Sequence, residues 1–253
     1  MDIDLTGEVG HGLSEACTEA DSSLWPLLST ALVPCGAHSG EPTSMLRACS
    51  EAMARDVALG AAVGYADRIG GGERFIDYDS DDLAATIIYQ LGALDGLARA
   101  EQARVGCIRP SGALFEAART DRNHAWAVVN AVLDYDPSLT IIGLPGSRLL
   151  QSVERHGLNI AREFQPHRLL NANGSLGAVL TDPDAVTRRA LEAAATGNYD
   201  CIRLPGHSVA ERATAGAIHT ALREAGHRIT SDRVMVASDL PVLLSLAPAR
   251  TPA

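Results

Sequence analysis

The stretch Cys35-Gly36-Ala37-His38-Ser39-Gly40-Glu41-Pro42 joins a short apolar run to a long helical pattern and is the most informative part of the chain. The apolar run covers 30–33, and the helical pattern covers 43–56. A strand, a polar loop and a helix in this order form the repeating unit of parallel α/β folds. The stretch therefore predicts that His38 follows the carboxyl end of a strand, where such folds place their functional groups.

The same alternation of short apolar runs and helical patterns continues along the chain. Seven strands are expected, at 3–5, 30–33, 58–63, 105–108, 140–143, 160–164 and 201–204. Six helices are expected, at 43–56, 80–101, 124–134, 147–156, 183–196 and 209–226. These numbers fit a barrel better than an open sheet, although periodicity alone decides neither. We expect one α/β domain over 1–246, a β/α barrel with parallel strands and outer helices, and a flexible tail at 247–253.

Composition excludes several classes of protein. The formal net charge of −10 opposes nucleic-acid binding, because no basic stripe can neutralise a phosphate backbone. All 21 basic residues are Arg, so neither a Schiff-base lysine nor a P-loop lysine is present. The five Cys form no Cys-x-x-Cys pair, and the chain shows neither a signal peptide nor a membrane segment. These features predict a cytoplasmic protein with reduced thiols.

Polar residues follow several of the predicted strands, and a barrel brings such residues together on one face. We expect the catalytic group to consist of Glu8, His38, Asp67, Arg109 and His207. Carboxylates and imidazoles move protons, and a guanidinium holds an anionic group, which together suit chemistry at an amide bond. The alternatives are structural: loop carboxylates such as Glu8 and Asp67 commonly cap helices, and Arg109 equally well forms a salt bridge across the barrel mouth.

The order of the motifs resembles the LamB/YcsF family. The motifs are Asp2 to Glu8, Cys35 to Pro42, Gly60 to Asp67, Ile108 to Phe115, Glu163 to Arg168 and Leu204 to His207. The resemblance runs to about Ile229 and implies a distorted TIM-like barrel of the glycoside hydrolase/deacetylase type. It also implies the activity of the 5-oxoprolinase A subunit, which is the ATP-dependent opening of the 5-oxoproline lactam to glutamate with subunits B and C.

Several chemically active residues of the family pattern are replaced. Histidines of the family pattern correspond to Ala62, Ser111 and Pro205, and two of its acids correspond to Pro166 and His207. Alanine and proline cannot replace an imidazole as a proton carrier near neutral pH. The motifs further imply that five residues contact the substrate, namely Asp4, Tyr65, Ser111, Glu163 and His167. No metal site is expected.

Two functions remain open at this level. The first is a diverged enzyme that acts on a lactam or a related small cyclic carboxylated metabolite, by hydrolysis or by a recruited cyclisation or dehydration. The second is a non-catalytic barrel that binds a metabolite or a partner subunit. The cofactor is unknown, with ATP expected through partner subunits if the family activity is retained. The expected partners are the small cyclic substrate, 5-oxoprolinase subunits B and C, or a second copy of the chain.

Overall fold

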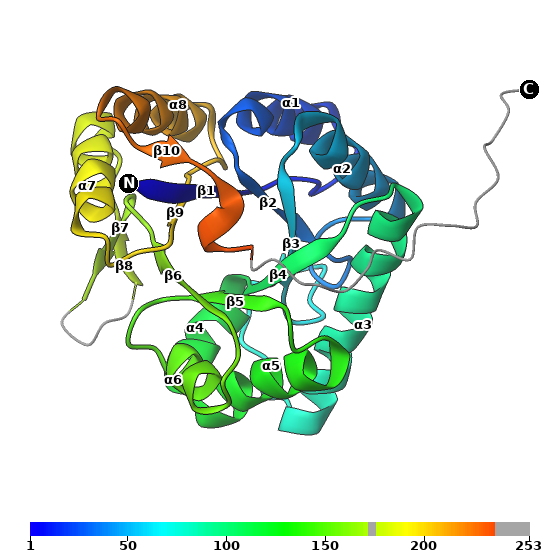
Figure 1. Ribbon diagram of the computed structural model, residues 1–253. Helices are drawn as coiled ribbons and strands as arrows, with labels where there is room; N and C mark the ends of the chain where they lie inside the picture. Colours follow the sequence, from blue (N-terminus) through cyan, green and yellow to red (C-terminus); the bar gives the residue numbers. More distant parts are fainter. Residues whose placement is uncertain (172–175, 236–253) are drawn as a thin grey trace, which may run out of the picture.

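The computed structural model describes residues 1–171 and 176–235, in which strands and helices alternate (Figure 1). The barrel strands are β1 Asp2–Glu8, β2 Thr30–Pro34, β3 Ala58–Val63, β4 Val105–Pro110, β5 Thr140–Gly143, β6 Ile160–Phe164 and β9 Cys201–Arg203. The helices are α1 Glu15–Leu24, α2 Pro42–Arg55, α3 Ser80–Ala100, α4 Gly112–Thr120, α5 Arg122–Tyr135, α6 Arg148–Arg155, α7 Pro183–Thr196 and α8 Val209–Glu224. The expected tail at 247–253 and the domain boundary before it lie outside the described residues.

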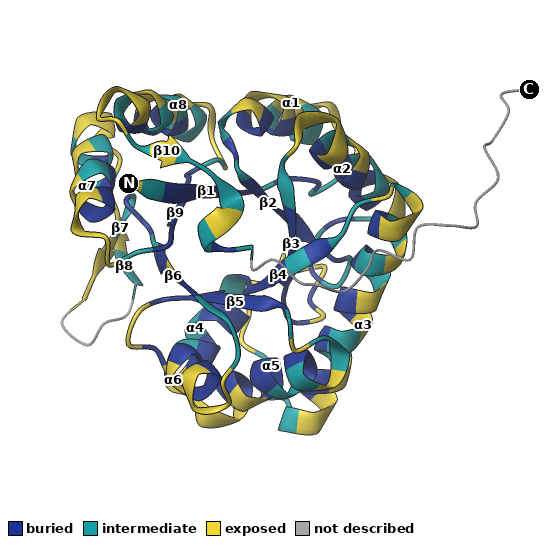
Figure 2. Ribbon diagram, in the orientation of Figure 1, coloured by how far each residue is buried: buried dark blue, intermediate teal, exposed yellow. Residues whose placement is uncertain are grey.

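The sheet closes on itself. All pairings run parallel in the order β1-β2-β3-β4-β5-β6-β9, and β9 pairs with β1 again, so that Asp4 lies opposite Cys201 and Thr6 opposite Arg203. The helices lie outside this ring and present buried faces to it (Figure 2). The predicted α/β fold with a parallel barrel and outer helices is confirmed.

Side chains alternate between the helices and the interior of the barrel. On β1, Ile3 and Leu5 belong to the main hydrophobic core, whereas Asp4, Thr6 and Glu8 occupy the alternate positions. The middle of the interior is filled by a second apolar cluster of small and medium side chains, which are Leu32, Ala62, Cys107, Ile142, Ala161, Cys201 and Val234. A packed interior restricts ligand access to the two ends of the barrel.

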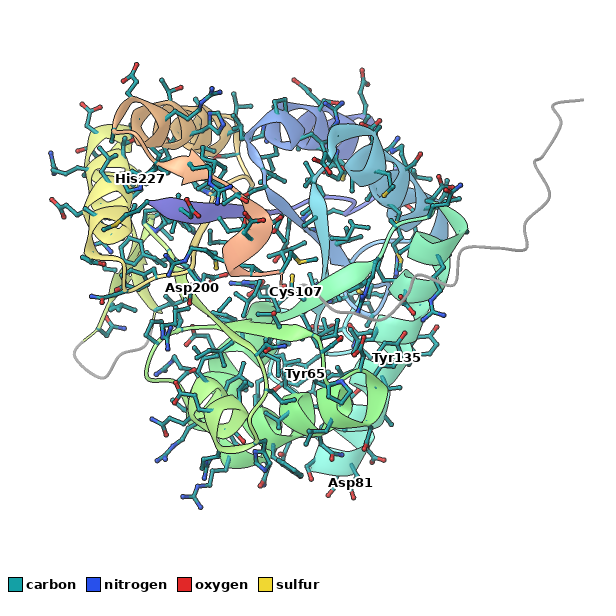
Figure 3. All side chains as sticks on the ribbon, in the orientation of Figure 1. Tyr65, Asp81, Cys107, Tyr135, Asp200 and His227 are labelled. Atoms are coloured by element: carbon teal, nitrogen blue, oxygen red, sulfur yellow. The ribbon has the colours of Figure 1, made fainter. Side chains whose placement is uncertain are left out.

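The amino end of the barrel is covered by the last described segment, drawn in orange in Figure 1. Strand β10, Arg228–Ile229, pairs with the start of β1, and the short helix η2, Ser231–Arg233, follows it. Val234 then packs into the interior cluster. Arg233 Nη2 donates to Asp200 Oδ1 at 2.8 Å. Asp200, labelled in Figure 3, lies just before β9. The carboxyl end is therefore left for a ligand.

Helices α1 and α4 and a small antiparallel pair were not predicted. Helix α1 is mostly polar and buries only Asp21 and Leu24, so its sequence carries no strong apolar period. Helix α4 is short and starts at Gly112, whose φ of 55° suits only glycine readily. The antiparallel pair β7 Arg168–Leu170 and β8 Leu176–Val179 follows β6 outside the barrel. In the described residues, no helix is both long and apolar enough to cross a membrane.

Candidate active site

A buried ion pair spans the carboxyl end of the barrel between β4 and β6. Arg109 Nε and Nη2 donate to Glu163 Oε2 and Oε1 at 2.6 and 2.9 Å, in a bidentate arrangement. Gln165 Nε2 donates to the same carboxylate at 2.7 Å, and the guanidinium lies 4.2 Å from the Phe115 ring centre. Burial works to raise the pKa of Glu163, but the Arg109 charge and hydrogen bonds outweigh it and keep the pKa low.

A second carboxylate, Glu8 at the end of β1, connects to this pair. Its Oε1 lies 3.0 Å from Arg203 Nη2 and 3.7 Å from Arg109 Nη1, and it accepts a hydrogen bond from Ser111 Oγ at 2.8 Å. Burial opposes ionisation of Glu8, but the charges of Arg203 and Arg109 hold its pKa well below the usual range. Two carboxylates and two guanidinium groups thus form one charge-balanced cluster.

Two cavities open beside the cluster. The larger, of about 490 Å³, lies between α1 and the start of α8, and the smaller, of about 200 Å³, lies toward α4 and the β7–β8 pair. They share four lining residues, namely Glu8, Arg203, Leu204 and His207. Glu8 and Arg203 therefore stand at the junction of the two cavities.

The smaller cavity is bordered by polar atoms without partners. Arg168 Nε, Arg203 Nη1 and His167 Nδ1 are buried and form no hydrogen bond with the described residues. A buried polar atom without a partner costs about 1–3 kcal/mol. Burial lowers the pKa of His167 to about 4, so the ring is neutral at neutral pH. Two cations and one neutral imidazole form a suitable set of partners for a carboxylate.

His11 was not predicted as a site residue, although it follows β1. Its Nδ1 lies 3.0 Å from Ser39 Oγ, and its Nε2 lies 3.7 Å from Glu8 Oε2 on the wall of the larger cavity. Burial lowers the pKa of His11 despite the opposing charge of Glu8. A neutral imidazole fixed by a hydroxyl and facing a carboxylate can accept or deliver a proton.

His38 is buried beside the cluster but lines neither cavity. A Cβ atom at Gly64 would lie 2.6 Å from its Nδ1, and one at Gly72 would lie 2.9 Å from its Cβ. These glycines allow the neighbouring loops to close over the ring. Burial lowers its pKa, so His38 is a neutral imidazole enclosed by backbone, and the structure gives it no direct access to a ligand in either cavity.

Three other predicted residues have partners away from the cavities. Asp67 accepts hydrogen bonds from Gly70 N at 2.9 Å and from Arg74, and that side-chain bond lowers its pKa to about 2. Tyr65 is fully buried, and its hydroxyl lies 2.8 Å from His124 Nδ1. Asp4 accepts from two hydroxyls at 2.6 Å each and lies four residues before Glu8 on β1, a distance of about 13 Å.

The predicted set is thus only partly brought together. Four of its members line a cavity, namely Glu8, Arg109, His167 and His207. Glu163 is part of the charged cluster, and Ser111 donates a hydrogen bond to Glu8 in the same cluster. Arg203 was missed, although it directly precedes the Leu204 to His207 motif at the end of β9. In the described residues, no group of three His, Cys, Asp or Glu side chains is arranged to hold a metal ion.

Comparison with known proteins places the chain among bacterial relatives. Residues 3–236 match the LamB/YcsF family. The chain is 40% identical to the 5-oxoprolinase A subunit of Streptomyces coelicolor over 223 residues, which cover 86% of this chain and 88% of the relative. The corresponding 5-oxoprolinase chain of Streptomyces avermitilis is 39% identical over the same length and coverage.

Two solved structures have similar folds. The lactam utilization protein of Thermus thermophilus superimposes with a TM-score of 0.83 at 30% identity, over 91% of this chain and 99% of that one. A peptidoglycan N-acetylglucosamine deacetylase domain from Eubacterium rectale reaches a TM-score of 0.50 at 11% identity, over 90% of this chain and 87% of that one. The second likeness shows a shared fold alone.

Proposed function

The chain belongs to the LamB/YcsF family, and we propose that it binds a small lactam carrying a carboxylate and acts on the lactam amide bond. The observation that carries this proposal is the set of three unpartnered buried atoms, on Arg168, Arg203 and His167, around a cavity of about 200 Å³. The names of the relatives, a 5-oxoprolinase A subunit and a lactam utilization protein, supply the substrate class.

The positions of the donors suggest one orientation for the lactam. Arg168 and His167 line only the smaller cavity and would bind the carboxylate. Arg203 stands at the junction of the cavities, so its Nη1 would bind the carbonyl oxygen and stabilise the negative charge that develops there. The reacting carbonyl carbon would then face Glu8 and His11.

In ring opening, a nucleophile adds to the carbonyl carbon, the ring C–N bond breaks, and the nitrogen takes up a proton. His11 is the neutral base that fits the first proton transfer, and the Glu8 charge stabilises the imidazolium formed. Ser111, where the family pattern has a histidine, donates to Glu8 instead. We therefore propose that proton transfer in this chain has shifted to His11 and His207.

The proposal includes partner subunits, because the relatives are named as one subunit of an enzyme. Subunits B and C would bind ATP, as the resemblance to the family implies, and this chain contains no lysine with which to build a P-loop. A substrate, a nucleotide and a second protein would then meet at the mouth of the barrel.

A non-catalytic binding barrel is the second candidate. It is favoured by the complete pairing of Glu8 and Glu163 with arginines and by the enclosure of His38. Carboxylates with lowered pKa are weak bases. The two candidates differ in turnover with ATP and subunits B and C, because only the enzyme releases glutamate.

Thermal unfolding with and without millimolar 5-oxoproline tests the binding site, since a ligand of the folded state alone raises its stability. We expect a rise in Tm with 5-oxoproline and a much smaller rise with 2-pyrrolidinone, which lacks the carboxylate. In Arg203→Gln, 5-oxoproline should not raise the Tm above that of the same variant without ligand. Arg99→Gln, at an exposed pair on α3, should retain it. Equal responses to both lactams would overturn the proposal.

A further inference from the structure

The larger cavity has its own walls. Ala16, Ala20 and Leu24 on α1 and Val209 on α8 provide apolar surface, and none of them lines the smaller cavity. Helices α1 and α8 lie side by side at the edge of the barrel (Figure 1). The cavity meets the proposed lactam pocket only at the residues that the two share.

The volume of this cavity exceeds what hydrolysis requires. A water molecule occupies about 30 Å³ in the liquid, whereas the cavity measures about 490 Å³. A cavity of this size is within the range of sites for small organic molecules. The space beyond the lactam carbonyl therefore fits an organic group as nucleophile or leaving group.

The lining indicates the chemistry of that group. Three carboxylates, Glu8, Glu19 and Asp21, line the larger cavity against the two guanidinium groups of Arg203 and Arg212. Glu8 is paired with Arg203 and Asp21 accepts from Gly10 N, so Glu19 is the carboxylate left to receive an amine, and the apolar walls suit its alkyl chain. A second observation points to a ligand at the junction: Arg203 is only 8% exposed, and its Nη1 has no partner among the described residues.

We propose that the larger cavity binds the amine part of a linear amide whose acyl part closes to the lactam in the smaller cavity. This inference rests on the proposed lactam function. The free amino nitrogen of the linear substrate attacks the amide carbonyl carbon and forms the ring C–N bond, and the original C–N bond breaks. The attacking nitrogen loses a proton to His11, 3.7 Å from Glu8, and the departing amine nitrogen receives it. No other reactant is consumed.

The probe is γ-glutamylbutylamide, which closes to 5-oxoproline and butylamine. Calorimetry should show that it binds about tenfold more tightly than 5-oxoproline, because part of its butyl chain is buried. Mass spectrometry should detect 5-oxoproline and butylamine in equal amounts. Ala20→Phe, which fills the larger cavity from α1, should remove the tenfold gain and leave 5-oxoproline binding unchanged. Ala54→Phe on the exposed face of α2 is the matched control.

The outcomes separate the two proposals. If 5-oxoproline binds, the butylamide binds no more tightly than 5-oxoproline, and Ala20→Phe changes neither affinity, the amine site is overturned and the lactam site stands. If the wild type binds the butylamide, Ala20→Phe abolishes that binding, and 5-oxoproline binds to neither protein, the lactam pocket is overturned. Tight binding of the butylamide with no butylamine released contradicts the closure step.

Discussion

The two ends of the barrel differ in how their charged groups are satisfied. At the amino end, Asp4 accepts from Ser29 and Thr30, and Asp200 pairs with Arg233 from the closing segment. At the carboxyl end, Arg109 and Glu163 are equally well paired, but Arg203 and Arg168 each retain a buried nitrogen without a partner among the described residues. The charged groups Asp4 and Asp200 at the amino end are paired, whereas two guanidinium groups at the carboxyl end keep donors for a ligand.

The largest expected effect comes from the carboxyl end. Arg109→Gln leaves the fully buried carboxylate of Glu163 without its bidentate partner, and breaking such a pair costs about 3–5 kcal/mol of unfolding free energy. Urea unfolding measures this loss. Arg228→Gln, at an exposed pair with Asp2 at the amino end, is the matched control and should remain close to wild type. Similar losses in both variants would contradict the difference between the ends.

A smaller effect should come from Asp4, whose pKa burial raises to about 7. A carboxyl group with a higher pKa in the folded chain binds protons there preferentially, so stability falls as pH rises from about 4 to 7. Asp4→Asn resembles the protonated form and does not titrate. Its unfolding free energy relative to the wild type should therefore rise by about 2 kcal/mol from pH 5 to pH 8. Urea unfolding at both pH values checks this, and a difference independent of pH would show that Asp4 is ionised in both states.

The smallest effect should come from Arg168, on the rim of the smaller cavity. Arg168→Leu should weaken 5-oxoproline binding about tenfold, the cost of one charge-assisted hydrogen bond. Stability without ligand should not fall, because Arg168 Nε has no partner to lose among the described residues. Calorimetry and urea unfolding provide the two readouts. A variant that unfolds more easily but binds normally would assign Arg168 to the fold and remove it from the site.

The barrel could be predicted because its signals are local. Each strand is a short apolar run, and the seven predicted strands overlap β1 to β6 and β9. Helix α5 begins two residues before the predicted start. The Asp121 side chain accepts from Asn123 N and His124 N, so the helix begins at Arg122. The β7–β8 pair was missed because Arg168–Leu170 is too short to show a period.

The site was harder to predict because side-chain direction depends on tertiary structure. Glu8, Arg109 and Glu163, chosen because they lie at or after strand ends, do meet in one charged cluster, and their roles in a ligand site stay predictions. His38 also follows a strand, but the glycines at 64 and 72 enclose it. His11 and Arg203 carry no motif of their own. His11 lies near Glu8 because it follows three residues later, whereas only the pairing of β9 with β1 brings Arg203 within 4 Å of Glu8.

The most direct measurement is a crystal structure of the chain with bound 5-oxoproline. The account predicts the lactam in the smaller cavity, with its carboxylate on Arg168 and His167 and its carbonyl oxygen on Arg203 Nη1. A lactam bound only at the amino end, or one with its carboxylate away from all three residues, would contradict the assignment of the unpartnered atoms to the substrate.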